Sequence, residues 1–459
     1  MPNSTLHSSK FRTASVLLVT VLFLIALNAA PLHAQTYTDL YDLGSNAGDP
    51  ELPGGFLPQG ADGSFYGTAS SGAANGAGGI FHITTAGTLT LLSSFTSDSP
   101  GNGLTLKSDG NFYGVTEGGG PSCTPGVSCG TLFSITPAGT YTVIHAFLAG
   151  GDGLEPQVPP VEGTRHDLYG TTALGGVVGR GTGYHATTTQ EIGVIENRGD
   201  GALKLTGYDA RTNLFYGISA DTVFITTVFG NLTTLHNFGN GYSPTALILG
   251  SDGSLYGTTF EGGQTGCNGV GCGIVFKINP AGIFSVVHRF QPTEGRAPTT
   301  LVQGSDGSLY GTTLSDVANS AGIIFKIATD GTFSVLYNFT QATGQNPSGF
   351  TQGTNGVFYG VTQDGGSANG GVFFSFDLGL PAFARLLPTW GAAGDTIGII
   401  GQGFTGASAV SFNGTAATFT VQSDSYITAQ VPSGVKTGKV SVTTPGGTLS
   451  SITTFQVVP

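Results

Sequence analysis

Short segments of alternating apolar and polar residues fill the stretch from residue 299 to residue 339. They occupy residues 299–303, 308–313, 321–327 and 332–339. Asp306-Gly307 separates the first two segments and Asp330-Gly331 the last two, and such dipeptides favour two-residue hairpin turns. Period-two alternation is the pattern of a half-buried strand. This stretch therefore predicts four antiparallel strands that follow one another in the chain.

The same unit recurs along most of the chain. The ten residues 250–259 return at 304–313, and a Tyr-Gly pair marks every copy of the unit. Successive pairs lie from 40 residues apart (Tyr216 to Tyr256) to 56 residues apart (Tyr113 to Tyr169). A period of this size built only of strands is typical of propeller blades. The seven copies carry Tyr66, Tyr113, Tyr169, Tyr216, Tyr256, Tyr310 and Tyr359.

The two ends of the repeat region complement each other. Residues 36–43 match a fourth strand, whereas the seventh copy ends with a third strand at 371–376. The N-terminal strand is therefore expected to complete the last blade, which removes the free edges of the array. The predicted fold class is all-β: a seven-bladed β-propeller at residues 35–380 closed by the N-terminal strand, followed by a C-terminal immunoglobulin-like β-sandwich.

The fourth strand of each unit carries the most regular alternation. Phe284, Val286, His288 and Phe290 are expected to share one face of their strand. Sheets that stack on neighbouring sheets need such an apolar face. Burying each large side chain contributes about 1.5–3 kcal/mol, which offsets the destabilising effect of many glycines.

Composition agrees with an all-β chain. Gly accounts for 77 of 459 residues, charged residues for 9%, and Phe and Tyr for 30 and 15 residues. Many aromatic residues and few helix formers favour strands. The formal net charge is −12, and it becomes −14 if Lys10 and Arg12 are removed with an N-terminal segment. This charge disfavours nucleic acid and anionic membrane surfaces as partners.

Residues 1–34 have the pattern of a signal peptide. Lys10 and Arg12 precede an apolar run at 14–30, and residues 32–34 place a small residue before Gln35. The run is short for a membrane span, and a single N-terminal anchor helix is the alternative. We expect export to a secreted or cell-surface location, with no membrane span after the signal is removed.

The four cysteines form two short pairs, each in its own Gly-rich loop. In an exported chain the pairs Cys123 with Cys129 and Cys267 with Cys272 are expected to be local disulfides. The alternative is a metal site, which requires four converging ligands, and neither loop has a histidine beside its pair. No metal or other cofactor is predicted.

The C-terminal residues 381–459 follow a different pattern. Short alternating segments and turn glycines fit a small β-sandwich. The segment has a Pro-x-x-Gly-x-x-Gly opening at 388–394, a Gly-x-Gly-Phe turn at 401–404 and Val431-Pro432 before the last hairpin. On these motifs it resembles the IPT/TIG family of immunoglobulin-like domains. The resemblance implies a spacer or an interaction surface in an extracellular bacterial protein.

The repeat region also resembles a known family. Residues 253–259 and 273–278 carry the repeat motifs most clearly, and the likeness spans about residues 36–376. They resemble the bacterial tandem-repeat family called GloVer, which is found in exported proteins. The resemblance implies no assigned reaction.

Candidate catalytic residues each have a structural explanation. His145, His236 and His288 occupy one strand position in different blades, so they cannot converge on one metal. His82, His166 and His185 have no Cys or His at ligand spacing. Tyr66 and its equivalents either pack between sheets or line a tunnel and stack on sugars. An acid or amide precedes Gly in five hairpins, which explains Asp62, Asp109, Asp252, Asp306 and Asn355 as turn residues.

Residues 191–211 depart from the repeat. The strand pattern is lost there, and seven charges gather in an otherwise weakly charged protein. The segment is either a decayed repeat with a solvated surface or a specialised rim that binds a ligand. The charged residues are Glu191, Glu196, Arg198, Asp200, Lys204, Asp209 and Arg211.

The sequence favours an exported, noncatalytic binding or scaffold protein. Its variable loops between second and third strands, two of them held by the cysteine pairs, are expected to present a recognition surface. A glycan or another extracellular protein is the expected partner class. The alternative is an extracellular propeller enzyme that acts on polysaccharide, which requires two acids converging at one face of the axis.

Overall fold

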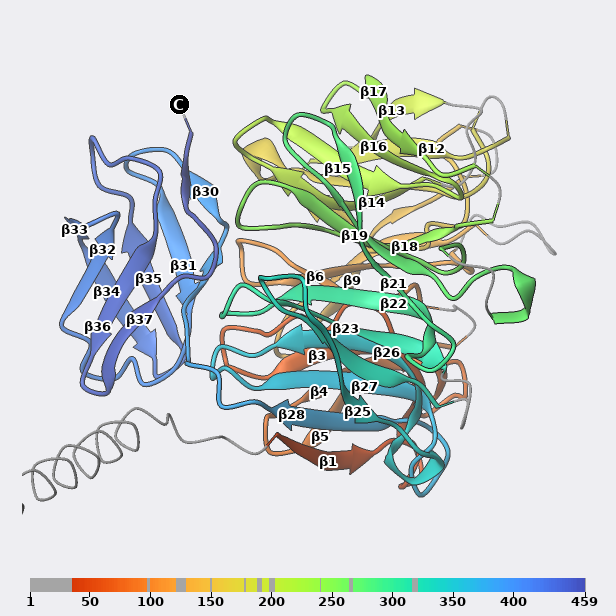
Figure 1. The fold of residues 1–459 in the computed structure, drawn as a ribbon. Helices are drawn as coiled ribbons and strands as arrows, with labels where there is room; N and C mark the ends of the chain where they lie inside the picture. Colours follow the sequence, from red (N-terminus) through yellow and green to blue (C-terminus); the bar gives the residue numbers. More distant parts are fainter. Residues whose placement is uncertain are drawn as a thin grey trace, which may run out of the picture. The chain divides into compact units, whose positions relative to one another are not determined.

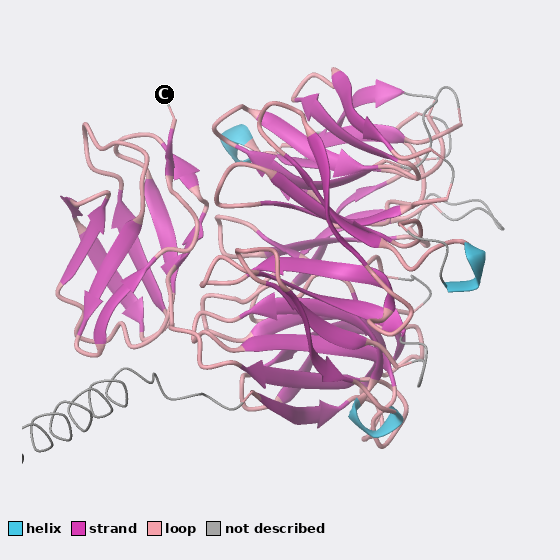
Figure 2. Ribbon diagram, viewed as in Figure 1, coloured by secondary structure: helices cyan, strands magenta, loops and turns pink. Residues whose placement is uncertain are grey.

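Each repeat folds into a four-stranded antiparallel sheet (Figures 1 and 2). The computed structural model describes residues 35–96, 100–120, 129–148, 151–176, 179–187, 192–197, 203–239, 241–263, 267–315 and 321–458. The repeat region supplies seven such sheets within these residues. We number them 1 to 7 in chain order.

The strands of sheets 1 to 4 follow the chain without crossover. They are β2 (Pro50–Gly54), β3 (Phe65–Gly72), β4 (Gly79–Ile83) and β5 (Leu89–Ser94) in sheet 1, and β6 (Thr105–Leu106), β7 (Phe112–Thr116), β8 (Thr131–Ile135) and β9 (Tyr141–Ala146) in sheet 2. They continue as β10 (Val161–Glu162), β11 (Leu168–Thr171), β12 (Thr182–Ala186) and β13 (Ile192–Asn197) in sheet 3, and β14 (Lys204–Asp209), β15 (Leu214–Ile218), β16 (Thr222–Thr227) and β17 (Leu232–Asn237) in sheet 4.

Sheets 5 to 7 repeat this order, with one exception in sheet 7. Sheets 5 and 6 contain β18 (Pro244–Leu249), β19 (Leu255–Thr259), β20 (Ile274–Ile278) and β21 (Phe284–Arg289), then β22 (Arg296–Gln303), β23 (Leu309–Ser315), β24 (Ile323–Ile327) and β25 (Phe333–Asn338). Sheet 7 contains β26 (Gln345–Gln352), β27 (Phe358–Asp364), β28 (Val372–Asp377) and the N-terminal β1 (Thr36–Asp42). The described residues also form the short 3-10 helices η1 (Thr164–His166), η2 (Cys267–Gly269) and η3 (Gln341–Thr343).

The N-terminal strand β1 completes sheet 7. It pairs antiparallel with β28, and Asp39 lies opposite Phe374. Sheets 1 and 7 also pack on each other, because the Phe65 and Tyr359 rings lie 4.6 Å apart within a shared apolar cluster. The first and last sheets of the repeat region are therefore neighbours.

The expected single apolar face of the fourth strand is wrong. In β21 a bulge interrupts the register between the partners of Val286 and His288. Phe284 stacks on His236 of sheet 4 at 3.7 Å, whereas His288 stacks on Phe333 of sheet 6 at 3.9 Å. The extra residue of a bulge turns the rest of a strand to its other face, so one strand packs on both neighbouring sheets.

The expected two-residue hairpin turn is also wrong. Gly304 N–H donates to the Ser308 carbonyl, and Gly307 N–H donates to the Gly304 carbonyl. These bonds enclose a three-residue loop in which Gly307 has φ +81°. A tight turn closed by a residue in the left-handed region is the usual three-residue hairpin, and it favours glycine at that position.

The described part of residues 191–211 forms strands, contrary to the loss of strand pattern in the sequence. β13 supplies the fourth strand of sheet 3 and β14 the first strand of sheet 4. Lys204 and Asp209 bound β14, and Arg211 lies in the turn that follows. Glu191, Arg198 and Asp200, with the side chain of Glu196, lie outside the described residues.

The C-terminal segment forms a sandwich. One sheet has the order β29-β31-β35-β34, a second has the order β33-β32-β36-β37, and β30 pairs in parallel with β38. Their core contains Ile399, Phe412 and Val442, each nearly or completely buried. The strands are β29 (Arg385–Leu387), β30 (Trp390–Gly391), β31 (Thr396–Ile400), β32 (Ala409–Phe412), β33 (Thr415–Ala417), β34 (Phe419–Ser423), β35 (Tyr426–Gln430), β36 (Val440–Thr444), β37 (Gly447–Ser450) and β38 (Gln456–Val457).

Candidate functional site

In sheets 5 and 6 the acid in the turn between the first and second strands is hydrogen-bonded to residues of its own sheet. Asp306 accepts from the N–H and the hydroxyl of Ser308 at 3.0 Å each, and from the Tyr310 hydroxyl at 2.9 Å. The Lys326 ammonium donates to the same carboxylate at 2.9 Å. We call the Asp-containing turns of sheets 1, 2, 5 and 6 the regular turns. In sheet 5 Asp252 has the equivalent donors Ser254, Tyr256 and Lys277.

These contacts control the ionisation of the turn carboxylates. Burial raises the pKa of Asp252, but the bonds from Lys277, Ser254 and Tyr256 outweigh burial and lower the pKa to about 2. The pKa of Asp306 is lowered by the same balance. Burial and the nearby Asp306 charge raise the pKa of Tyr310 to about 12. A carboxylate saturated with donors from its own sheet holds the turn and has little capacity to exchange a proton with a ligand.

Sheet 3 replaces this arrangement with a different cluster. Glu162 accepts from His166 Nδ1 at 2.8 Å and from the N–H of Ser108 in sheet 2 at 2.9 Å. The Ser108 hydroxyl also donates to Glu162 and lies 2.9 Å from His166 Nδ1. The hydrogen bond to Glu162 raises the pKa of His166. Because Ser108 and Glu162 meet the same ring nitrogen, the cluster lacks the relay of a catalytic triad, in which serine and acid meet opposite nitrogens.

The Glu162 contact has equivalents between other sheets. In three places a glutamine carbonyl accepts a backbone N–H from the preceding sheet's turn at 2.8–2.9 Å. The same glutamine donates its amide N–H to a glycine carbonyl of its own turn. His166 stands where that glycine stands and supplies the local partner of Glu162 instead. The glutamines are Gln59, Gln303 and Gln352.

The turn of sheet 4 is altered in another way. It runs through residues 210–213, and its acid Asp209 precedes the turn instead of lying within it. Asp209 accepts from the Arg211 guanidinium at 3.0 Å. A Cβ added to Gly253 of sheet 5 would lie 2.6 Å from Arg211 Nη1, so this guanidinium lies against the next turn. We call the turns of sheets 3 and 4 the altered turns.

A cleft of about 740 Å³ lies between the turns of sheets 4, 5 and 6, the end of β26 in sheet 7 and the C-terminal sandwich, within the single compact unit Thr36–Pro459. Serine, threonine and glutamine side chains supply much of its lining. Its charged residues, among those the structure describes, are Asp209, Arg211, Arg385 and Lys439. A concave site of this volume is in the usual range for small-molecule ligands.

Arg385 enters the cleft from β29, where the repeat region joins the sandwich. Its guanidinium donates to the Gln352 carbonyl at 2.6 Å. No carboxylate in the described part of the chain forms an ion pair with it. Burial lowers the pKa of Arg385 to about 10, so the side chain still carries its charge at neutral pH.

The sandwich also contacts the altered turn of sheet 3. Trp390 lies 5.1 Å from the His166 ring at an interplanar angle of 21°, and 6.2 Å from the Tyr208 ring. Elsewhere Ser425 donates its hydroxyl to the Ala61 carbonyl at 2.6 Å. Contacts at several turns fix the sandwich beside the cleft.

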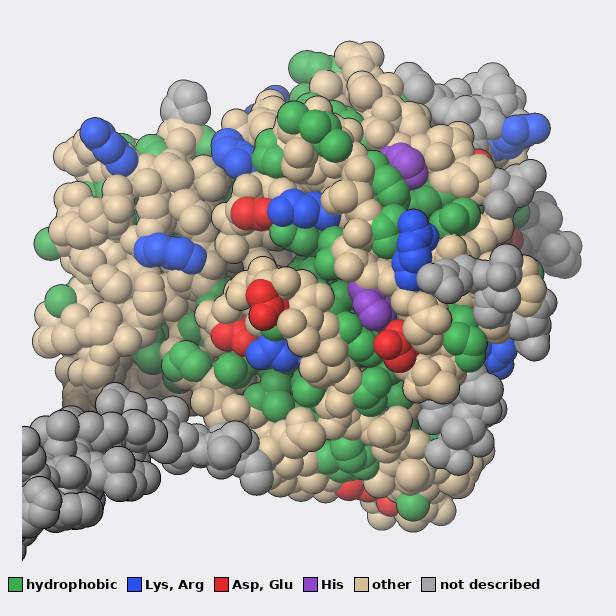
Figure 3. All heavy atoms as spheres, viewed as in Figure 1, with side chains coloured by type: hydrophobic (Ala, Val, Ile, Leu, Met, Phe, Trp, Pro, Cys, Tyr) green, Lys and Arg blue, Asp and Glu red, His purple; other side chains and the backbone are tan. Residues whose placement is uncertain are grey.

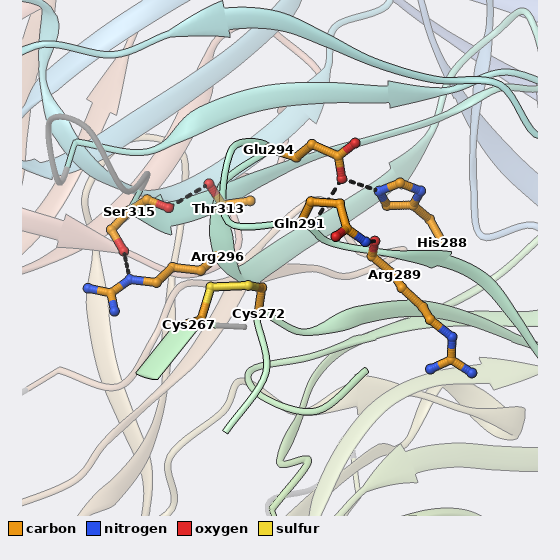
Figure 4. Close-up of a disulfide and its surroundings, with 9 residues drawn as sticks. All are labelled: Cys267, Cys272, His288, Arg289, Gln291, Glu294, Arg296, Thr313 and Ser315. Carbon is orange, nitrogen blue, oxygen red and sulfur yellow. Dashed lines mark hydrogen bonds and ion pairs between the residues drawn. A yellow bond between two sulfur atoms is a disulfide. The ribbon is translucent and has the colours of Figure 1, made fainter. Parts of the chain in front are cut away.

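The loops proposed for recognition lie at the opposite ends of the strands. Between β19 and β20, Cys267 and Cys272 form a disulfide with a Cα–Cα distance of 5.3 Å (Figure 4). His288 and Glu294 lie nearby and are 3.0 Å apart. Arg296 donates to the Ser315 hydroxyl at 2.8 Å. The disulfide and the bond from the Gly262 N–H to the Val270 carbonyl hold the described part of the β19–β20 loop.

The other expected disulfide falls partly outside the described residues. Cys123 belongs to residues 121–128, which the structure does not describe, although Cys129 is described as disulfide-bonded. The pairing of Cys123 with Cys129 stays a prediction.

The histidines singled out by the sequence lie apart from one another. His145 pairs with Asp152 at the end of its strand, His288 pairs with Glu294, and His236 stacks on Phe284. His82 takes the place of Lys326 and meets Asp62 at 3.2 Å. Within the described residues no three His, Cys, Asp or Glu side chains gather as a metal site.

Other parts of the described structure are weaker candidates for a ligand-binding site. A cavity between sheets 3 and 4 has a volume of only about 40 Å³, which is enough for very few waters. On the face drawn in Figure 3, charged side chains are few and form no broad patch of one sign. In the described part of the chain no helix has the length and apolarity of a membrane crossing.

Sequence reasoning missed the cleft, because its lining comes from four sheets and the sandwich. The signal that could have found it is the disagreement between copies: the turn of sheet 4 has Asp209 and Arg211 where the turns of sheets 5 and 6 have Gly and Asp. The charged 191–211 segment pointed to these two residues, although not to their partners.

Family comparisons cover most of the chain. The model of the Gloeobacter/Verrucomicrobia repeat matches residues 26–184, 156–374 and 220–418. The IPT/TIG domain model matches residues 381–457. No curated protein matches the chain.

Similar solved structures share the fold of the repeat region. A streptogramin B lyase has 17% identity and a TM-score of 0.54, over 76% of this chain and 99% of that chain. The virginiamycin B lyase of Staphylococcus aureus has 15% identity and a TM-score of 0.54, over 74% and 98%. A GH74 enzyme of Niastella koreensis has 14% identity and a TM-score of 0.48, over 89% and 65%. The likeness to the two lyases, at these identities, shows a propeller-like fold and leaves the reaction open.

Proposed function

Because this chain belongs to the Gloeobacter/Verrucomicrobia repeat family and carries a C-terminal IPT/TIG domain, we propose that it is an exported, noncatalytic protein that binds a glycan. The observation that carries this proposal is the cleft of about 740 Å³ that sheets 4 to 7 form with the sandwich. The seven sheets, with β1 completing the last, would close into a seven-bladed propeller that supports the cleft.

The lining of the cleft favours a glycan over a protein partner. Hydroxyl and amide side chains such as Ser251, Thr389 and Gln456 line the cleft beside turn glycines. Such groups can donate to and accept from sugar hydroxyls. The site is also concave, whereas protein partners usually bind through broad surfaces of about 800 Å² per partner.

The same lining supports binding without catalysis. Hydrolysis of a glycosidic bond commonly uses two carboxyl groups, and Asp209 is the single acid among the described residues that line the cleft. It is ion-paired with Arg211 at 3.0 Å. The turn acids Asp252 and Asp306 are bonded within their own sheets and do not line the cleft.

A glycan-array screen of the full exported chain tests the proposal. Retention on the array should be measured together with release of shortened or unsaturated sugars into solution. We expect retention of a subset of glycans without release. Product release would establish the enzyme alternative, and failure to retain any glycan while an extracellular protein binds would overturn the glycan assignment.

A further inference from the structure

Resting on the proposed function, we infer that the cleft binds an acidic glycan and that Arg385, Arg211 and Lys439 recognise its carboxylates. The formal charges on the described lining are three cations and one anion, Asp209. The whole chain carries −12. A local excess of positive charge on an acidic protein marks a place where the sequence retains cations against the overall balance.

The Arg385 guanidinium has N–H donors that the described protein groups do not use. A guanidinium presents five N–H groups, and in the described structure this one has a single hydrogen bond, to the Gln352 carbonyl. Half-buried polar groups normally gain partners. A planar carboxylate can accept two parallel N–H bonds from arginine, so an acidic ligand supplies what the protein does not.

The other cations lie where a longer ligand would extend. Arg211 is held at the edge of the cleft by Asp209, and its guanidinium lies against Gly253. Its side chain is 45% exposed, so it remains accessible. Lys439 is exposed on the sandwich, and its ammonium donates to the Ile452 carbonyl. The cations therefore come from the repeat region, the junction and the sandwich, and a ligand that spans them would contact both domains.

The test uses trigalacturonate as the acidic probe and its methyl ester as a neutral probe of the same backbone. Titration calorimetry with the full mature chain should show binding of the acid at least about tenfold tighter than binding of the ester. Its affinity should fall with added salt, because exposed charges are screened.

Matched variants separate the site from general charge effects. Lys439→Gln and Arg385→Gln should each weaken trigalacturonate binding several-fold, while Arg385→Lys should keep part of it. Lys436→Gln, an exposed lysine of the same domain outside the cleft, should leave binding unchanged. The exposed Lys439 site keeps the test valid if Arg385→Gln does not fold.

Each outcome decides between the two proposals. Equal binding of acid and ester overturns the inference and leaves glycan binding intact. Binding of the acid that Lys436→Gln weakens as much as Lys439→Gln also overturns it, because the charge would not be local. If neither probe binds and the array retains only neutral glycans, the inference fails alone; if the array retains none, the proposed function fails as well.

Discussion

The regular and altered turns both join the first and second strands of their sheets. They differ in the partners that their charged side chains contact. In sheets 5 and 6 the turn acid is satisfied by its own serine, tyrosine and lysine. In sheet 3 Glu162 and His166 contact Ser108 of sheet 2 and Trp390 of the sandwich. In sheet 4 Arg211 lies on the next turn and borders the cleft. The turn acids of sheets 5 and 6 are therefore bonded within their own sheet, whereas Glu162, His166 and Arg211 of the altered turns contact other sheets or the sandwich.

Substitution of the glycine in the Tyr-Gly pair, which lies in the second strand after both kinds of turn, should have the largest effect on stability. A Cβ at Gly311 would lie 2.3 Å from the Thr300 carbonyl oxygen and 2.5 Å from Phe325, and one at Gly217 would lie 2.4 Å from the Lys204 carbonyl oxygen. Gly311→Ala and Gly217→Ala should each lower the free energy of unfolding by about 2–3 kcal/mol, because the core is overpacked. Urea unfolding measures this loss.

Gly151→Ala is the control for these variants, because nothing lies within 4 Å of its added Cβ. It should leave the unfolding midpoint within error of the parent. A stable Gly217→Ala beside an unstable Gly311→Ala would mean that sheet 4 lacks the close strand packing of the other copies.

The turn residues themselves should separate the two classes. Asp306→Ala leaves Tyr310, Ser308 and Lys326 without their shared acceptor, and should cost about 1–2 kcal/mol of unfolding free energy. Arg211→Ala removes an exposed side chain and should cost less than about 0.5 kcal/mol, while weakening ligand binding. Equal losses of stability, or unchanged binding in Arg211→Ala, would break the distinction between the classes.

The smallest effect concerns the pH dependence of sheet 3. The pKa of His166 is raised by Glu162, so the contact stabilises the fold below the unfolded pKa and this contribution is lost as pH rises through the folded pKa. Solvent screening of the half-exposed ring limits it to a fraction of a kcal/mol. Glu162→Gln should flatten the change in melting temperature between about pH 5.5 and about pH 8.5.

Gln303→Glu places an acid in the equivalent position of sheet 6, where Gly307 replaces the histidine. It should not introduce a stabilisation of this sign in that pH range. A melting temperature whose pH dependence is the same in the parent and in Glu162→Gln would show that the pair does not titrate as described.

The repeated architecture was readable from the sequence because it depends on local periodicity. Tyr-Gly pairs and alternating strands identified the propeller-like repeats, and the opening motif at 388–394 identified the sandwich. The bulge beside His288 was not readable, since one extra residue changes the face of a strand without changing its composition. The cleft was not readable either, because Arg385 and Arg211 are 174 positions apart in the chain and meet only through tertiary structure.

The pairing of β1 with β28 has a consequence for how the protein reaches its native state. Asp39 meets Phe374, so the first strand to be synthesised waits for one of the last strands of the repeat region. Contacts between residues so distant in sequence slow folding, because a long loop must close before they form. Until then β28 presents an unpaired edge that can capture a strand of another molecule. The interval before β1 docks is therefore when the chain is most exposed to misassembly.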